Sequence, residues 1–219
     1  LPVGTVVTDT THGTFTVTVG GSYSLSSGTF TLPSGTNVTY KTFENGTGLP
    51  CFVSGTNIQT PNRATRVEGL KVGDMILTQD RGKQQIRWIG NRKFEASELQ
   101  ANPKLLPIHI MAGALGGGLP ERNLLVSRQH RMLVQSKIAE RMFGVDEVLV
   151  TAIKLTELPG IFVDEIVQSV EYIHLLFDQH EIIYAEGTPT ESLFTGPEAL
   201  KSISPEAREE IMTIFPEVA

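Results

Sequence analysis

The sequence predicts an all-β domain that begins near residue 51 and is followed by a single C-terminal helix. Three observations support this fold class. Short apolar and β-branched segments recur after residue 51, turn residues separate them, and the clearest helical pattern lies near the C-terminus. The chain has 219 residues, of which 40% are hydrophobic, and this is enough for one large domain with a smaller attachment.

Residues 1–50 differ from the rest of the chain in composition. They contain 26 Thr, Ser and Gly residues but only one Lys, one Asp and one Glu. Apolar and hydroxylated side chains alternate along residues 14–19 and 30–32, which is the period of a strand with one wet face, and Asn45-Gly46 indicates a turn. We predict a short β-hairpin at this N-terminal flank. A flexible linker is the alternative, because few large apolar side chains are available to bury.

The strands predicted after residue 51 are short and numerous. They cover residues 57–60, 65–68, 75–78, 84–91, 108–110, 124–126, 132–134, 148–150, 166–170, 172–177 and 181–185. Residues 96–100 are predicted to form one helical turn. In the C-terminal helix, Ser204 supplies the N-cap, Pro205 occupies the first helical position, and apolar residues follow at helical spacing.

The charge balance argues against polyanionic partners. The formal net charge is -6, the pI is about 5.4, and Lys and Arg are scattered along the chain. We therefore expect neither nucleic acid nor a membrane surface as a partner. No apolar run reaches the length of a transmembrane helix, and the first residues lack the basic and then apolar profile of a signal peptide. Because it begins without Met, the chain is expected to be a fragment of a longer protein.

Cys51 is the only cysteine and lies where the composition changes. A lone thiol cannot form an internal disulfide, so Cys51 is either a small buried hydrophobic residue or a reactive group. Imidazole is the proton acceptor best matched to a thiol near neutral pH. The candidate partners are Ser127 with His130, on a predicted turn between strands, and a later run that contains Asp178 and His180.

A metal site is the weaker interpretation of that later run. His174, Asp178 and His180 would project from one face of a strand, a geometry in which three ligands converge. Residues 180–184 lack the second histidine of a helical zinc-protease motif, and they are themselves predicted to be β. We therefore expect no metal and no other cofactor.

Four segments occur in an order that is specific in combination. Residues 51–58 read CFVSGTNI, residues 67–76 read VEGLKVGDMI, residues 127–130 read SRQH, and residues 172–180 run from Tyr to His. They resemble the opening Cys motif, the Gly-Asp strand pair, the Thr-x-x-His motif with Ser in place of Thr, and the late strand of the Hint domain. This module is shared by inteins, bacterial intein-like proteins and hedgehog autoprocessing domains, and the resemblance is closest to the bacterial form often found in large secreted proteins.

The resemblance implies an all-β horseshoe fold with pseudo-twofold halves and cleavage of the peptide bond between Pro50 and Cys51. Cys51 would attack the carbonyl carbon of Pro50 and convert the amide to a thioester by an N-to-S acyl shift. His130 would protonate the departing Cys51 nitrogen. Ser127 would hold the scissile bond or His130 by hydrogen bonding.

The remaining expectations also follow from the resemblance. His180 is the predicted second imidazole for proton transfer, and Asp178 is expected to orient it. Residues 1–50 would be the upstream flank, residues 51–194 the autoprocessing domain, and residues 195–219 a helical tail. The substrate would be the chain's own upstream polypeptide, and the acyl acceptor would be water, a thiol or an amine. The family and the flank together predict a secreted, extracellular bacterial protein.

Splicing is not expected, and two other interpretations stay open. Inteins end in His-Asn followed by a nucleophile, and asparagine cyclisation releases the downstream flank, whereas the corresponding register here, residues 190–192, reads Thr-Glu-Ser. A non-cleaving structural or adhesion module of a large secreted protein would have the same fold. A thiol hydrolase would instead act on a separate substrate.

Overall fold

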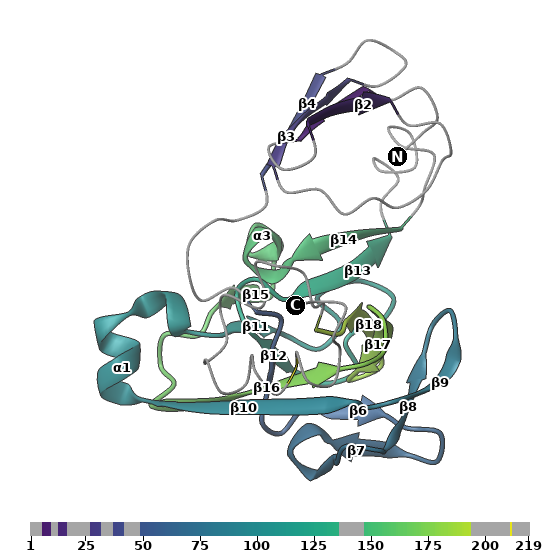
Figure 1. Ribbon diagram of the computed structural model, residues 1–219. Coiled ribbons are helices and arrows are strands. Elements are labelled where there is room, and N and C mark those ends of the chain that lie inside the picture. The colour runs from purple at the N-terminus through teal and green to yellow at the C-terminus, as the bar shows by residue number, and fades with distance from the viewer. Residues whose placement is uncertain are drawn as a thin grey trace. The chain divides into compact units, whose positions relative to one another are not determined.

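A computed structural model of the 219-residue chain describes residues 6–9, 13–16, 27–31, 37–41, 49–135, 147–193 and 211. The chain divides into two compact units (Figure 1). The first comprises Leu1–Gly46 and Gln135–Val148, and the second comprises Thr47–Val134 and Leu149–Ala219. Each unit contains its own β-sheet structure, and the second holds all of the sequence-predicted site residues.

The N-terminal strands form a four-stranded antiparallel sheet in the order β2-β1-β3-β4. These strands are β1 (Val6–Asp9), β2 (Gly13–Thr16), β3 (Ser27–Thr31) and β4 (Asn37–Lys41). The segments predicted at residues 14–19 and 30–32 overlap β2 and β3, which both pair with β1. The predicted hairpin is therefore part of a larger sheet.

A six-stranded sheet in the second unit has the order β10-β16-β5-β12-β11-β15, and all of its pairs are antiparallel. Its strands are β10 (Trp88–Glu95), β16 (Ser169–Leu176), β5 (Phe52–Val53), β12 (Leu124–Val126), β11 (Ile108–Ile110) and β15 (Ile161–Val163). The two long strands, β10 and β16, run side by side (Figure 1). The short β5 lies between β16 and β12, so the residues next to β5 meet two other chain segments.

The second sheet of this unit has the order β14-β13-β18-β17-β6-β7, and β8 joins it by pairing with both β17 and β9. Its strands are β14 (Glu147–Thr151), β13 (Arg131–Gln135), β18 (Thr188–Glu191), β17 (Ile182–Ala185), β6 (Asn57–Gln59), β7 (Ala64–Arg66), β8 (Met75–Thr78) and β9 (Gly82–Gln85). β17 and β18 form a hairpin, and β18 also pairs with β13 through Met132 and Thr190.

Within the described residues the helices are few and short, so the predicted all-β fold class is confirmed. They are α1 (Ala96–Ala101), α3 (Ala152–Leu155) and the 3-10 turns η1 (Val67–Gly69) and η2 (Pro103–Leu105). α1 matches the predicted helical turn, and a capping box formed by Glu95 and Glu98 begins it. The predicted C-terminal helix lies outside the described residues apart from Ile211, which is helical and buried. None of the described helices is long and apolar enough to cross a membrane.

Several strand predictions differ from the structure. Residues 84–91 belong to two strands, β9 and β10, because the backbone of Ile86 and Arg87 between them bonds to other segments. The segments at 166–170 and 172–177 contribute to a single strand, β16, and Ile166 is 84% exposed. β5 and β15 were not predicted. β18 was not predicted because Pro189 interrupts its pattern.

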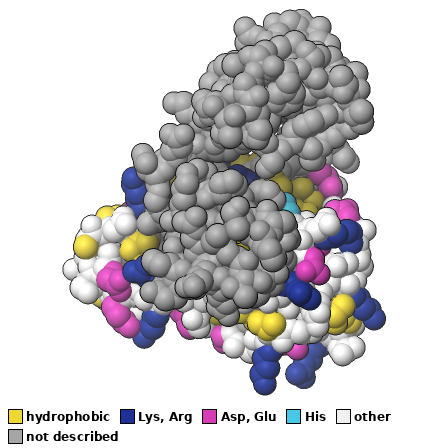
Figure 2. All heavy atoms as spheres, viewed as in Figure 1, with side chains coloured by type: hydrophobic (Ala, Val, Ile, Leu, Met, Phe, Trp, Pro, Cys, Tyr) yellow, Lys and Arg dark blue, Asp and Glu magenta, His cyan; other side chains and the backbone are white. Residues whose placement is uncertain are grey.

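Two apolar clusters form the core of the second unit. The first joins its two sheets and includes Phe52, Ile58, Val126, Ile173 and Ile183. The second lies on the opposite face of the six-stranded sheet and includes Leu49, Cys51, Trp88, Tyr172, Leu176, Leu193 and Ile211. Successive strand residues point to opposite faces, so Phe52 enters the first cluster while Cys51 enters the second. On the face shown in Figure 2, Lys and Arg side chains are interspersed with Asp and Glu on the described surface.

Candidate active site

Cys51 lies immediately before β5, between two strands that place side chains on either side of it. Phe52 pairs with Ile173 of β16 and with Val126 of β12. Extending both antiparallel registers by one residue puts Cys51 opposite His174 on one side and Ser127 on the other. The backbone amide of Ser127 donates to the Cys51 carbonyl at 3.0 Å, so the register continues through this residue.

The hydroxyl of Ser127 holds the segment from Leu49 to Cys51 at two points. It donates to the Leu49 carbonyl at 2.7 Å and accepts the Cys51 backbone N–H at 3.1 Å. Because a hydroxyl has one proton and two lone pairs, it can make both contacts at once. Pro50 therefore lies in a short turn whose two ends are fixed by one side chain.

His174 contacts both chemical groups that the predicted cleavage would bring into reaction. Its Nδ1 lies 3.0 Å from the Pro50 carbonyl oxygen. A carbonyl oxygen only accepts, so in the neutral ring Nδ1 carries the proton and Nε2 is left as the acceptor. Nε2 in turn lies 3.5 Å from the Cys51 sulfur, and the Cys51 thiol donates to the Leu49 carbonyl oxygen at 3.0 Å.

His130 lies on the turn after Ser127, and its side chain is fully buried. Its backbone amide donates to the Ser127 carbonyl at 3.1 Å, and its ring packs edge-on against Phe52, with 4.6 Å between centroids. The Nε2 atom contacts the hydroxyl of Thr190. The buried Nδ1 atom makes no hydrogen bond of normal geometry within the described residues.

Burial keeps the ionisable groups of the site uncharged at neutral pH. It raises the pKa of the Cys51 thiol well above its ordinary value, although a hydrogen bond with Ser127 opposes the shift. It lowers the pKa of His174 to about 4, against the opposing hydrogen bond to Pro50. It lowers the pKa of His130 to about 3, with the nearby His174 and Arg131 side chains adding to the effect and the nearby Cys51 backbone opposing it. The site thus contains a neutral thiol beside two neutral imidazoles.

The structure places Asp178 and His180 apart from these groups. Asp178 is 61% exposed and forms an ion pair with Arg87 at 3.3 Å. His180 Nε2 lies 3.3 Å from a carboxylate oxygen of Glu191. The imidazole beside the Cys51 sulfur is that of His174, which begins the candidate run 174–181 but was assigned no catalytic role of its own from the sequence. The strand that carries His174 was predicted, but its pairing with β5, which selects this histidine over His180, leaves no local signal in the sequence.

No metal centre is visible in the described part of the chain, where no group of three or more His, Cys, Asp or Glu side chains is arranged to hold an ion. His174, Asp178 and His180, which a straight strand would have placed on one face, lie partly beyond the end of β16. The chain turns after Leu176, and the three side chains therefore have different partners.

An all-β fold with a buried cysteine between a serine and two histidines, at the junction with an upstream segment, defines a domain of the autoprocessing type. The family model described as the Hint domain matches residues 50–197, which is more than half of the chain. The chain therefore belongs to the Hint domain family, as predicted. Domains of this intein-like type act on their own flanking polypeptide.

Among solved structures, the chain is similar to a bacterial intein-like domain from Clostridium thermocellum, with 12% identity and a TM-score of 0.43 over 65% of this chain and 97% of that chain. It is similar to the gp41-1 intein at 14% identity and a TM-score of 0.39, over 64% and 97% of the two chains. An AceL NrdHF class 3 split intein variant gives 12% identity and a TM-score of 0.44, over 66% and 97%. No curated protein matches the chain.

Proposed function

We propose that this chain is a single-turnover self-cleaving domain that breaks the peptide bond between Pro50 and Cys51. The observation that carries the proposal is the position of His174, which reaches the Pro50 carbonyl oxygen with one ring nitrogen and the Cys51 sulfur with the other. One neutral imidazole is thus placed to activate the nucleophile and to stabilise the oxygen of the bond under attack.

The first step is attack of the Cys51 sulfur on the carbonyl carbon of Pro50. His174 Nε2 takes the thiol proton as the carbon–sulfur bond forms. Negative charge then develops on the Pro50 oxygen, where the N–H of His174 Nδ1 already donates at 3.0 Å. Because the thiol is neutral in its buried environment, the proton has to leave during the attack rather than before it.

The second step breaks the bond between the Pro50 carbon and the Cys51 nitrogen. This nitrogen takes up one proton as it leaves: the proton that His174 removed from the sulfur passes to His130, which delivers it to the nitrogen, while Ser127 keeps the nitrogen and the Leu49 carbonyl in register. Overall, one proton moves from sulfur to nitrogen, so both imidazoles end as neutral as they began. The product is a thioester between Pro50 and Cys51, with a free α-amine on Cys51.

The thioester is then resolved by water, a thiol or an amine, which releases the upstream polypeptide. Release of the downstream flank by asparagine cyclisation is not part of the proposal, because residues 190–192 contain no Asn. In this scheme residues 1–50 end the released flank, residues 51–194 do the chemistry, and residues 195–219 are a tail. A secreted location would fit a domain that processes a larger exported chain.

A non-cleaving structural module is the second candidate function. Cys51 is only 6% exposed and belongs to an apolar cluster, as a structural cysteine would. The same burial disfavours a thiol hydrolase that acts on a separate substrate.

Intact mass spectrometry of the purified protein, incubated with and without a small thiol, tests the proposal. We expect the thiol to accelerate a break between Pro50 and Cys51, and we expect Cys51→Ala to stay whole. His109→Ala is the matched control, since His109 lies on β11, separated from β5 by β12, and pairs with Asp164. If the wild-type chain stays intact for days with thiol, the result would favour the structural-module function over self-cleavage.

A further inference from the structure

Thr190 is a buried residue of β18 whose hydroxyl contacts the ring of His130. The Thr190 oxygen contacts His130 Nε2 and lies 2.9 Å from the Arg131 carbonyl oxygen and 3.5 Å from the Met132 sulfur. The side chain has no exposed surface. Thr190 has no role in the cleavage steps proposed above.

The hydrogen-bonding capacity of these groups determines where the protons lie. The Arg131 carbonyl can only accept, so the single proton of the Thr190 hydroxyl is donated to it. The hydroxyl then has only a lone pair to offer His130 Nε2, which must carry a proton to make the contact. A neutral imidazole has one N–H, and the Nδ1 atom of His130 is therefore a bare acceptor.

We propose that Thr190 is a positioning residue that fixes His130 as the Nε2–H tautomer and so keeps Nδ1 free to take up the proton released by the thiol and to deliver it to the Cys51 nitrogen. The buried Nδ1 without a normal hydrogen bond is the atom this tautomer leaves open. The role of this tautomer in cleavage rests on the proposed function. The assignment of the tautomer rests only on the hydrogen bonds of Thr190 and His130.

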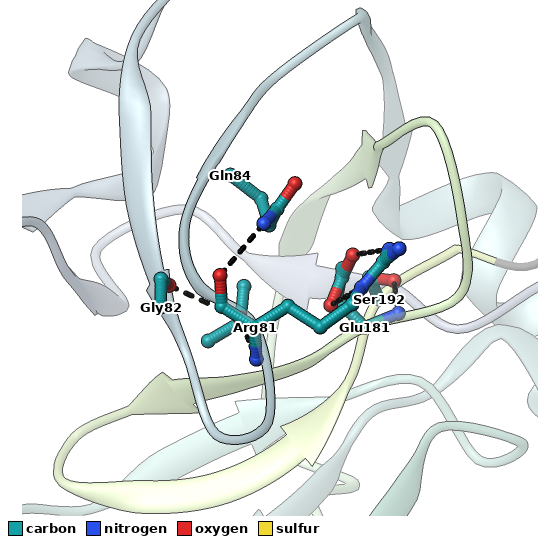
Figure 3. Close-up of polar contacts among 6 residues, drawn as sticks. Arg81, Gly82, Gln84, Glu181 and Ser192 are labelled. Carbon is teal, nitrogen blue, oxygen red and sulfur yellow. Dashed lines mark hydrogen bonds and ion pairs between the residues drawn. The ribbon is translucent and has the colours of Figure 1, made fainter.

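Two buried carboxylates, those of Glu181 and Glu191, hold β18 in place near Thr190. Glu181, next to the start of β17, forms an ion pair with Arg81 and donates its backbone N–H to Ser192 Oγ at 2.9 Å. Figure 3 shows the Arg81 side chain extending from its turn to Glu181, beside Ser192 at the end of the hairpin. The hairpin is thus tied to the turn between β8 and β9.

Glu191, which directly follows Thr190, provides the second anchor. One carboxylate oxygen accepts the backbone N–H of Arg131 at 2.9 Å, and the other lies 3.5 Å from the Arg131 guanidinium and 3.3 Å from His180 Nε2. Arg131 follows His130 in sequence, so this contact joins the segments that carry the hydroxyl and the imidazole. The Thr190 oxygen therefore has little freedom to leave His130.

The tautomer can be read directly from the ¹⁵N chemical shifts of the His130 ring in a Cys51→Ala chain, which stays intact. We expect a protonated Nε2 and an unprotonated Nδ1, with the signal assigned by its loss in His130→Asn. Thr190→Val keeps the branched shape but removes the hydroxyl, and it should shift the ring toward the Nδ1–H form. Thr190→Ser keeps the hydroxyl and should retain the original signature.

Two results would overturn the tautomer assignment. One is a protonated Nδ1 in the parent chain, which decides the matter even if Thr190→Val does not fold. The other is an unchanged Nε2–H signature in a folded Thr190→Val chain. Neither result depends on cleavage, so the tautomer can be judged separately from the proposed function.

The role in cleavage is tested with Cys51 restored. We expect Thr190→Val to slow thiol-induced cleavage by about tenfold or more, because general acid catalysis contributes about 10²- to 10⁴-fold and a misplaced proton forfeits part of it. Thr190→Ser should stay within about threefold of the parent rate, as expected if the hydroxyl rather than the methyl group matters. If Thr190→Val changes the tautomer but cleaves at the parent rate, Thr190 is not a positioning residue for the reaction.

Discussion

His174 is the residue whose substitution best separates the proposed mechanism from the alternatives. We expect His174→Ala to slow thiol-induced cleavage by about 100-fold or more, because it removes both the base at 3.5 Å from the Cys51 sulfur and the donor at 3.0 Å from the Pro50 oxygen. The rate is measured as the decay of the intact mass. His109→Ala, a histidine truncation two strands away, should leave the rate unchanged.

The same measurement on His180→Ala decides whether His174 or His180 is the second imidazole that takes part in cleavage. The sequence predicted His180 as the second imidazole, whereas its ring lies against Glu191 in the structure. A strong rate loss in His180→Ala together with a near-normal His174→Ala would restore the original prediction and remove the basis of the proposed first step.

At the residue scale, sequence reasoning identified the groups that a short motif carries. Cys51, Ser127 and His130 belong to two segments with distinctive residues, and the structure brings the two segments together through the pairing of β5 with β12. His174 lies inside the segment 172–180, whose resemblance pointed to its last residue, His180, and Thr190 lies outside all four segments. Both depend on which strands pair across the sheet, and strand pairing is a long-range property that hydrophobic alternation does not encode.

The β17–β18 hairpin is the element that connects the site to the second sheet. Its residue Glu191 is buried and supplies the acceptor for the backbone N–H of Arg131. We expect Glu191→Ala to lower the free energy of unfolding by about 2 kcal/mol, since a buried donor without an acceptor costs about 1–3 kcal/mol. The measurement is urea unfolding in the Cys51→Ala background.

Glu191→Gln is the matched control for this prediction. Its side-chain carbonyl can still accept from Arg131, so we expect it to recover most of the lost stability, although it gives up the charge facing His180. Equal destabilisation by both substitutions would show that the negative charge, rather than the acceptor, holds the hairpin.

The strands themselves were largely predictable, and their boundaries were less so. Alternation located β6, β8, β11, β12 and β17 to within a residue or two. It could not locate β18, whose Pro189 has no N–H to donate, yet this strand lies between β13 and β17 and carries Thr190. The least regular strand thus provides a contact to the buried histidine.

At the scale of the whole molecule, the residue upstream of Pro50 is packed in the core of the domain that would cleave the chain. Leu49 is buried in the same apolar cluster as Cys51, with Trp88 and Tyr172. Cleavage after Pro50 would therefore leave the new C-terminus packed inside the domain, and release of the flank would have to withdraw Leu49 from this cluster. The fold class and family were evident from the sequence, but this packing of the upstream residues was not.

The buried histidines also make the stability of the folded domain depend on pH. The pKa of His174 falls from 6.5 to about 4 on folding, because burial penalises the charged ring. Between these pH values the unfolded chain binds a proton at this site and the folded chain does not, so the free energy of unfolding decreases as the pH falls. The effect should amount to about 2 kcal/mol for this histidine between pH 7.5 and pH 5.

Urea unfolding of Cys51→Ala at these two pH values, with and without His174→Gln, measures this contribution. The difference between the two proteins cancels the titration of their shared carboxylates, and Gln keeps a donor for the Pro50 carbonyl while lacking a proton-binding site in this range. We expect the loss of stability on acidification to be smaller in His174→Gln. Identical losses in both chains would mean that His174 titrates in the folded domain as it does in the unfolded chain, and would contradict the lowered pKa of its buried ring.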